Sequence, residues 1–310
     1  MDANIARITR EIEVIHESPA RESLYRLLHH RSAQVGMVIL GILVICAIFA
    51  KQIAPYDPIQ VLRDVQRRES PCIHLFGCPD DRPEHIFGID GNSRDLFSRV
   101  IYGSRLSLQV GLATISFAII IGGLIGAFAG FIGGWIDDLL MRAMDILMAF
   151  PSLLLAIAIV SALGIGLINA LLAIGIVSIP RFARLVRSTV ISIKEQDFII
   201  AARSIGAKQT WMLFRHIMPN SWTPLIVQGT LGIATAILDA AALSFLGLGA
   251  EPPRPEWGLM LGEERNSIFN APHLVFFPGV AIMMTVLGFN LLGDGLRDAL
   301  DPRLRGTGAG

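Results

Sequence analysis

Long apolar runs separated by polar segments are the main pattern of this chain. The first run covers Ser32 to Ala50, and Gln34 is its only strongly polar residue. Because about 20 apolar residues are needed to cross a bilayer, this run predicts a first transmembrane helix. The preceding residues 1–31 are polar and carry five arginines. Since this start lacks the apolar stretch of a secretory signal, the run is interpreted as a retained span.

Two longer runs predict three more spans. Leu106 to Ile136 is free of charge over 31 residues, which is enough for one tilted helix and a turn. Ile146 to Pro180 is free of charge over 35 residues. As a single helix it would be about 52 Å long, which exceeds the ~30 Å of the hydrocarbon core. It must therefore fold back, and Gly164 and Gly166, with Asn169 close behind, mark the break.

Runs from Trp222 to Leu248 and from Leu274 to Leu292 complete the pattern. The chain is therefore predicted to be an all-α polytopic membrane protein with six transmembrane helices. The expected spans are about 32–50, 106–131, 146–163, 167–187, 223–248 and 274–292. The polar segments are 1–31, 51–105, 194–220, 249–273 and 296–310, and residues 106–295 form the expected transmembrane core.

Lysine and arginine are distributed unequally among the polar segments. If the N-terminus is inside, the inner segments hold sixteen of these residues and the outer segments ten, eight of them in 51–105. Long segments count for less in the positive-inside rule, so the short loops decide the orientation. The outer turn near Gly164 holds none and the loop 249–273 holds two. We therefore expect both termini to be cytoplasmic.

Glycine recurs at every fourth position late in the second predicted span, at Gly122, Gly126, Gly130 and Gly134. On a helix this spacing places the four residues on one stripe, where another backbone can approach closely. The pattern predicts a helix-packing face, with Gly134 at or beyond its end in the turn. The alternative is that glycine is simply frequent in membrane helices.

Composition agrees with a membrane protein and narrows the candidate chemistry. The chain is 53% hydrophobic and 17% charged, against roughly 25% charged in soluble domains. Its formal net charge is zero, so no basic field indicates nucleic acid as a partner. Cys46 lies in an apolar run. Cys72 and Cys78 bracket a polar stretch and could form a disulfide outside the cytoplasm, with two free thiols as the alternative.

Motifs for catalysis and nucleotide binding are missing from the sequence. A P-loop needs a Gly-Lys pair to hold phosphates, but the three lysines follow Ala50, Ile193 and Ala207. The seven histidines form no cluster of metal ligands. We therefore expect no catalytic residue, metal or cofactor in this chain. Asp239, inside the fifth predicted span, is a candidate functional acid. A structural acid that faces a neighbouring subunit, or a protonated one, is the interpretation we prefer.

The segment 194–220 combines charged and apolar residues in a predicted cytoplasmic loop. Gln196 to Ile205 predicts a short helix that Gly206 ends in a left-handed turn. Thr210 to Ile217 predicts a second helix, closed at Pro219. A helix–glycine–helix unit of this kind is a docking element, either for lipid headgroups or for a soluble protein.

Residues of this loop also match a known family. Ala201, Ala202, Gly206 and the His216-Ile217-Met218-Pro219 end resemble the EAA loop of binding-protein-dependent ABC transporter permeases. The family's glutamate falls on Ile200, which is a departure from the pattern. Further stretches that resemble the family are His85 to Asp90, Ser93 to Leu108, Leu243 to Gly258 and Phe289 to Pro302. Together they cover roughly residues 20–305 and are closest to the second permease subunit of the dipeptide/oligopeptide/nickel group, dipeptide type.

The resemblance implies a type I ABC importer (MetI-like) permease fold and half of a translocation pathway for peptides, most closely dipeptides. It implies as partners a homologous second permease subunit, two cytoplasmic ATP-binding subunits, an extracytoplasmic substrate-binding protein and the lipid of the inner membrane. ATP would be used by the partner subunits, and Ala201, Ala202, Gly206, His216 and Pro219 would belong to the coupling loop. Oligopeptides, glutathione or nickel are alternative substrates. The competing class is a self-contained secondary transporter, which would need several polar groups at mid-membrane.

Overall fold

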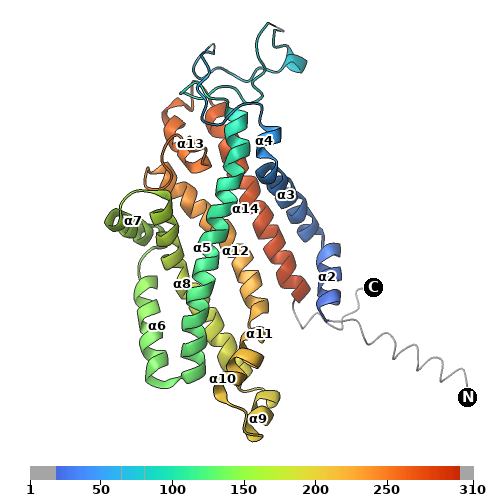
Figure 1. The fold of residues 1–310 in the computed structure, drawn as a ribbon, viewed down its shortest axis with the longest axis vertical. Helices are drawn as coiled ribbons and strands as arrows, with labels where there is room; N and C mark the ends of the chain where they lie inside the picture. Colours follow the sequence, from blue (N-terminus) through green and yellow to red (C-terminus); the bar gives the residue numbers. More distant parts are fainter. Residues whose placement is uncertain (1–18, 64, 80, 301–310) are drawn as a thin grey trace, which may run out of the picture.

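Long helices that lie side by side make up most of the molecule (Figure 1). The computed structural model describes residues 19–63, 65–79 and 81–300. Five of the described helices are long and apolar enough to cross a membrane. A sixth span results if α6 (Gly134–Met148) and α7 (Ser152–Leu163), which are bent by 93°, count as one. The five are α3 (Arg31–Ile48), α5 (Leu96–Ile132), α8 (Leu167–Lys194), α12 (Trp222–Phe245) and α14 (His273–Leu300).

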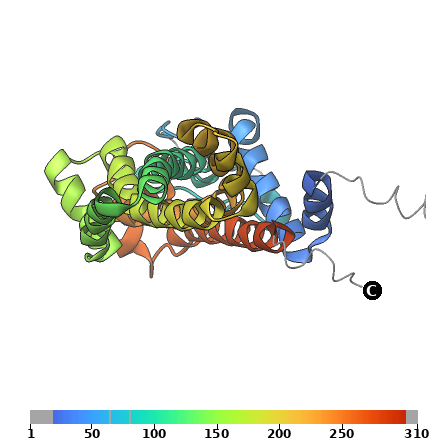
Figure 2. The same cartoon turned by 90° about the horizontal axis from the view of Figure 1, so that it is seen from below.

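The helices pack around the pair α5 and α8. Helix α12 packs against α5, α8 and α14, and α3 packs against α14 and α5. Seen from below, α6 and α7 lie at one edge of the group and α2 (Pro19–His29) lies with α3 at the other (Figure 2). One buried apolar cluster joins α5, α7, α8 and α12, and a second joins α3, α5, α12 and α14.

The two ends of the helix group carry different structures. At one end, here called the cap end, the polar cap (residues 54–95, as far as they are described) lies beside α13 (Trp257–Glu264) (Figure 1). At the opposite end, the loop end, lie α9 (Asp197–Ser204) and α10 (Gln209–Met212). Helices α2 and α14, the first and the last that the structure describes, are in contact away from the cap. His30, which directly follows α2, has its Nε2 atom 3.3 Å from the Asp298 carboxylate.

Helix α5 begins ten residues before the predicted run. Asp95 is its N-cap, and its carboxylate accepts a hydrogen bond of 2.8 Å from the Ser98 backbone N–H. Such a cap satisfies a backbone donor that has no partner within the helix. Arg99 and Arg105, at the end of the predicted outer segment 51–105, therefore belong to α5. Short α4 (Ala50–Ile53) extends the first span beyond α3.

The predicted span 146–163 differs from the structure. The chain bends between Met148, the last residue of α6, and Ser152, the first residue of α7. Pro151 is the physical reason, because proline lacks a backbone N–H and disfavours helical geometry in the residue before it. The following break is confirmed, since Gly164 and Gly166 have φ angles of +99° and +143°.

Candidate functional site

Helix α9 ends as the sequence predicts. Gly206 has a φ of +82°, its N–H bonds to the Arg203 carbonyl at 3.0 Å, and the Ala207 N–H bonds to the Ala202 carbonyl at 3.1 Å. This pair of bonds is a Schellman motif, which satisfies carbonyls at the end of the helix. A Cβ added to Gly206 would meet nothing within 4 Å. Backbone conformation alone therefore explains the glycine.

The second helical stretch of the loop does not close where it was predicted to. Helix α10 continues into a π-helical turn (Leu213–Ile217) and then into α11 (Met218–Asn220), and only Ser221 separates α11 from α12. Pro219 lies in the first turn of α11, directly after the π-helical turn. The prediction that Pro219 and Asn220 end the helix is therefore wrong, and the loop is tied directly to α12.

The two alanines of the loop face in different directions. Ala201 is exposed, whereas Ala202 is partly buried and packs against the large apolar cluster of the molecule together with Ala207. Ile199, one turn before Arg203, is almost fully buried. Ile200, at the position of the family's glutamate, is 47% exposed. The structure therefore separates the predicted pair, and Ala201 with Ile200 forms the outward face.

Aromatic contacts hold the loop together beneath an exposed apolar surface. The ring of His216 lies 4.7 Å from that of Trp211 and 6.1 Å from that of Phe198, edge to face in both cases. His216 thus joins α9 to the π-helical turn. Large apolar side chains that remain exposed on this unit are Phe198, Ile200, Ile205, Trp211 and Phe214. An apolar patch on charged surroundings is typical of an interaction surface.

The glycine stripe of α5 lies against the backbone of α8. A Cβ on Gly122 would lie 2.6 Å from the Ile179 carbonyl oxygen, and one on Gly130 would lie 2.9 Å from that of Arg187. On Gly126 it would overlap the carbonyl oxygen of Ala183. These positions pack closely, as expected from the spacing. Gly134 has a φ of +61° in the turn before α6 and meets nothing.

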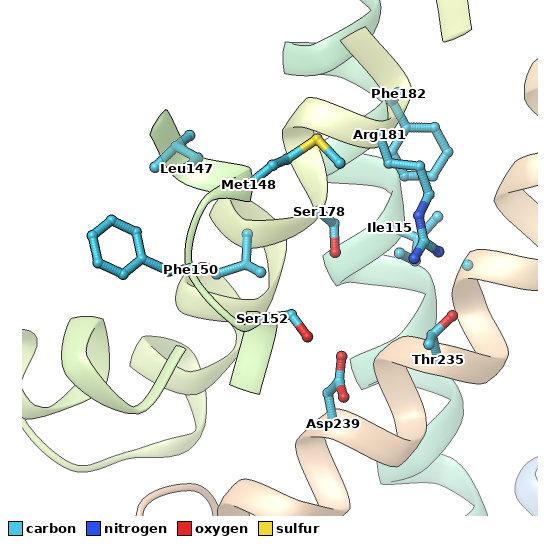
Figure 3. Close-up of a pocket in the computed structure, with 12 residues that line it drawn as sticks. Ile115, Leu147, Met148, Phe150, Ser152, Ser178, Arg181, Phe182, Thr235 and Asp239 are labelled. Atoms are coloured by element: carbon cyan, nitrogen blue, oxygen red, sulfur yellow. The ribbon is translucent and has the colours of Figure 1, made fainter. Parts of the chain in front are cut away.

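Asp239 lies on the wall of a cavity of about 230 Å³ between α12, α8 and the start of α7 (Figure 3). Ser178 and Arg181 of α8, Thr235 of α12 and Ser152 of α7 supply its other polar groups. Figure 3 shows the side chains of Arg181 and Asp239 directed toward the same space. Asp239 is half-buried and makes no hydrogen bond to the described residues. The remaining wall is apolar, with Ile115, Leu147, Met148, Phe150, Val177 and Phe182.

Two neighbouring arginines of α8 are neutralised within the chain. Arg184 lies 2.5 Å from the Asp145 carboxylate, and Arg187 binds both oxygens of Asp137 at 2.5 and 2.7 Å. Arg181, three residues before Arg184, has no such partner among the described residues. The sequence analysis did not identify Arg181 as a candidate site residue. Its place inside an apolar helix, on the stripe of the paired arginines, was the signal that could have identified it.

A buried network of charges joins the polar cap to the helices. Arg94 donates to Asp90 at 2.6 Å and to Glu263 at 3.1 Å, and Arg99 lies 3.4 Å from the same Asp90. Arg99 also donates to the carbonyls of Pro58 and Pro253 at 3.1 and 3.2 Å. Arg94 and Arg99 are almost fully buried. The sequence analysis quoted Asp90, Arg94 and Arg99 without recognising the network, because Glu263 is 169 residues from Arg94.

Helix α13 closes the cap end from the other side. Glu256 is its N-cap and accepts hydrogen bonds from the N–H groups of Gly258 and Leu259 at 3.0 and 2.7 Å. Burial raises the pKa of the Glu256 carboxyl above its ordinary value, while the two backbone donors oppose this shift. The indole N–H of Trp257 donates to the Val100 carbonyl at 3.0 Å. Helix α13 is thereby fixed to α5.

Cys72 and Cys78 form a disulfide in the structure, with Cα atoms 5.2 Å apart. Nearby, the N–H and carbonyl of Cys72 pair with those of His85 at 3.0 and 2.9 Å. Cys46 is free and half-buried on α3. Among the described residues, no group of three or more His, Cys, Asp or Glu side chains could hold a metal ion.

Two family models match the sequence. Residues 122–306 match the binding-protein-dependent transport system inner membrane component, and residues 18–71 match the N-terminal transmembrane domain of oligopeptide transport permease C. The first match contains α8, α12, the loop with α9 and α10, and Asp239. The second contains α2 and α3. Both matches agree with the all-helical, multi-pass structure.

Several relatives are similar to this chain in sequence over most of its length. The dipeptide transport system permease protein of Alkalihalophilus pseudofirmus is 50% identical over 93% of this chain and 91% of its own. The di/tripeptide transport system permease protein of Pseudomonas aeruginosa is 46% identical over 94% and 95%. The glutathione transport system permease protein of Escherichia coli O157:H7 is 46% identical over 93% and 92%.

A solved structure shares the fold. The inward-facing MetNI methionine ABC transporter matches with a TM-score of 0.55 and 18% identity, over 66% of this chain and 97% of the matched chain. It supports the type I ABC importer permease fold that the resemblance implied. The chain belongs to the family of binding-protein-dependent transport system inner membrane components, and it is a multi-pass inner membrane protein.

Proposed function

We propose that this chain is the permease subunit that forms half of the translocation pathway of an ATP-driven peptide importer, with dipeptides as its main substrates. The observation that carries the proposal is the α9–Gly206–α10 unit. It presents apolar side chains at the end of the molecule opposite the polar cap, and it continues through α11 into α12, which carries Asp239. A movement of α9 would therefore reach the cavity wall through the Gly206 turn and the short helices that lead into α12. The relatives named for dipeptides support the substrate class.

The partners follow from what this chain lacks. A homologous second permease would form the other half of the pathway, opposite the cavity that contains Asp239. Two cytoplasmic ATP-binding subunits would bind ATP and dock on α9 and α10, while this chain itself binds no cofactor and is not an enzyme. An extracytoplasmic binding protein would deliver the peptide to the cap end. The buried ion pairs of that end provide a firm surface for it.

The orientation belongs to the same proposal, with both termini and the coupling loop in the cytoplasm and the cap outside. Reporter fusions at Gly164 and at Pro253 should read as extracytoplasmic, and fusions at Lys208 and Gly306 as cytoplasmic. Gly306 lies outside the described residues. A cytoplasmic signal at Pro253 would overturn this orientation, since it requires an odd number of crossings between Pro253 and each end of the chain.

Reconstitution tests the function directly. The chain would be tagged and purified from the native membrane, and the co-purifying subunits reconstituted with the loaded binding protein in proteoliposomes. We expect vanadate-sensitive, ATP-dependent uptake of a radiolabelled dipeptide. Uptake by this chain alone, driven by an ion gradient and without an ATP-binding subunit, would instead establish the secondary transporter. Uptake of glutathione or nickel but of no dipeptide would keep the machinery and reject the proposed substrate.

A further inference from the structure

Three arginines of α8, spaced three residues apart, differ in whether they are paired. Arg184 and Arg187 each contact a carboxylate of α6, and these contacts fix both guanidinium groups within the chain. Arg181 continues the same stripe but contacts no carboxylate within 4 Å in the described chain. It is exposed and lines the cavity. A guanidinium group in an apolar helix that is left without an anion is costly unless water or a ligand solvates it.

An acid without a partner lies on the facing helix. Asp239 of α12 lines the same cavity and is half-buried, and Arg181 is the charge that acts on it through space. The two groups form no ion pair within 4 Å in the described chain, and both line the cavity (Figure 3). Thr235 lies one turn before Asp239, and its hydroxyl donates a hydrogen bond to the Leu231 carbonyl. The hydroxyl oxygen of Thr235 can therefore still accept a hydrogen bond.

A cavity with separated opposite charges fits a particular class of solute. Dipeptides are zwitterions, with an ammonium group at one end and a carboxylate at the other. Asp239 can accept hydrogen bonds from an ammonium group, and the guanidinium of Arg181 can bind a carboxylate through two parallel N–H groups. The apolar wall, which includes Ile115, Met148 and Phe182, can contact the side chains of the peptide without selecting among them.

We propose that Asp239 and Arg181 form a transient binding site for the two termini of a zwitterionic dipeptide within the translocation pathway, Asp239 for the ammonium group and Arg181 for the carboxylate. This inference rests on the proposed function and deepens it. The site would discriminate by free termini rather than by side chains. It would also give Asp239 a role in place of the structural one that the sequence analysis preferred.

Equilibrium binding to the permease–ATPase complex without its binding protein tests the site. The complex in nanodiscs would be titrated with alanyl-phenylalanine, with N-acetyl-alanyl-phenylalanine and with alanyl-phenylalanine amide, each followed by saturation-transfer NMR. The binding protein is left out because it selects peptides itself. For the wild-type complex, the dissociation constant of either blocked peptide should be at least about tenfold higher than that of the free peptide. Each block removes one charge-assisted contact.

Two variants that each remove one charge separate the roles. Asp239→Asn should lose the preference over the acetylated peptide and keep the preference over the amide. Arg181→Gln should show the reverse. Matched controls are Asp138→Asn and Arg142→Gln, which make the same charge changes at exposed positions of α6 away from the cavity. Both controls should retain the wild-type ratios. If one cavity variant fails to assemble, the other still tests its own terminus.

Uptake measured together with binding distinguishes failure of the proposed site from failure of the proposed function. Wild-type complex that takes up dipeptide but binds free and blocked forms equally, or binds none, would overturn the site and leave the proposed function intact. Unchanged ratios in both cavity variants would do the same. Wild-type complex that takes up no dipeptide would overturn the proposed function and this inference with it. A crossed pattern of ratios in the two variants is the result that supports the site.

Discussion

The cap end and the loop end of this molecule differ in how their charged and apolar side chains are buried and paired. At the cap end, charged groups are buried and paired, with Arg94 and Arg99 contacting Asp90 and Glu263 inside the chain. At the loop end, apolar groups are exposed, and Ile205 at the tip is 87% exposed. Ion pairs inside the chain hold the cap end together, whereas the loop end displays an apolar surface on a short helical unit.

This difference indicates what each end does. Buried ion pairs are costly to break because removal of one partner leaves an uncompensated charge, so the cap end is expected to move as a rigid piece. Exposed apolar side chains on a short helical unit gain stability only when another surface excludes water from them. The loop end is therefore the part that we propose to dock on a partner.

Separation of the two central helices should give the largest effect, because α5 begins in the cap and α8 leads to the loop. Gly126→Leu would force a side chain into the Ala183 carbonyl and push the helices apart. We expect little folded protein in the membrane, measured by fluorescence size-exclusion chromatography. Gly123→Leu is the control, since a Cβ there meets nothing within 4 Å. Equal yields of the two variants would mean that the stripe is not a packing face.

Removal of a buried charge should destabilise the cap end next most strongly. Arg99→Met would leave Asp90 and Glu263 with less compensation, and breaking a buried pair costs about 3–5 kcal/mol. Arg82→Gln, whose contact with Glu69 is exposed at 3.5 Å, should cost under about 1 kcal/mol. Thermal unfolding of the purified complex compares them. Similar melting temperatures for both variants would contradict a firmly paired cap.

Substitution at the turn of the loop should spare folding and impair coupling. Gly206→Val places a β-branched residue at a φ of +82°, at a strain of roughly 1–3 kcal/mol. We expect normal insertion but uptake reduced about tenfold per ATP hydrolysed. Gly206→Asn is the control, because asparagine tolerates left-handed backbone. Normal uptake per ATP in Gly206→Val would show that this turn does not transmit the movement.

The smallest effect is expected at the tip of the cap. With Cys46 replaced by serine, Cys72 and Cys78 should react with a membrane-impermeant thiol reagent only after reduction, since their sulfur atoms are joined. Reduction should leave uptake nearly unchanged, because the bridge closes only a short loop. Labelling of unreduced protein, followed by mass spectrometry, would show two free thiols instead.

Local signals in the sequence predicted much of this structure. The glycines at 164 and 166 marked a real chain reversal, and Asn169 secures it by donating to the carbonyls of Leu163 and Gly164 at 3.2 and 3.0 Å. The stripe at Gly122, Gly126 and Gly130 predicted close packing because helical spacing is a local property. Gly206 likewise predicted its own left-handed turn.

Features that depend on distant partners were not accessible in the same way. Arg94 and Glu263 are 169 residues apart, so no local pattern indicates their contact. The orientation of Ala202 toward the apolar core of this chain depends on how α9 packs. The placement of Asp239 and Arg181 on one cavity depends on how α8 packs near α12. Pro151, by contrast, was a local signal for the bend inside the predicted third span.

The central claim is that the outward face of α9 docks on an ATP-binding subunit, and a cross-linking measurement tests it most directly. In a Cys46→Ser background, Ala201→Cys and Ala202→Cys complexes would be treated with a short cysteine-to-lysine cross-linker. The account predicts a product of this chain with the ATP-binding subunit for Ala201→Cys and much less for Ala202→Cys, which faces its own core. Cross-linking of Ala201→Cys only to aminophospholipid, with the ATP-binding subunit present and unreacted, would contradict it.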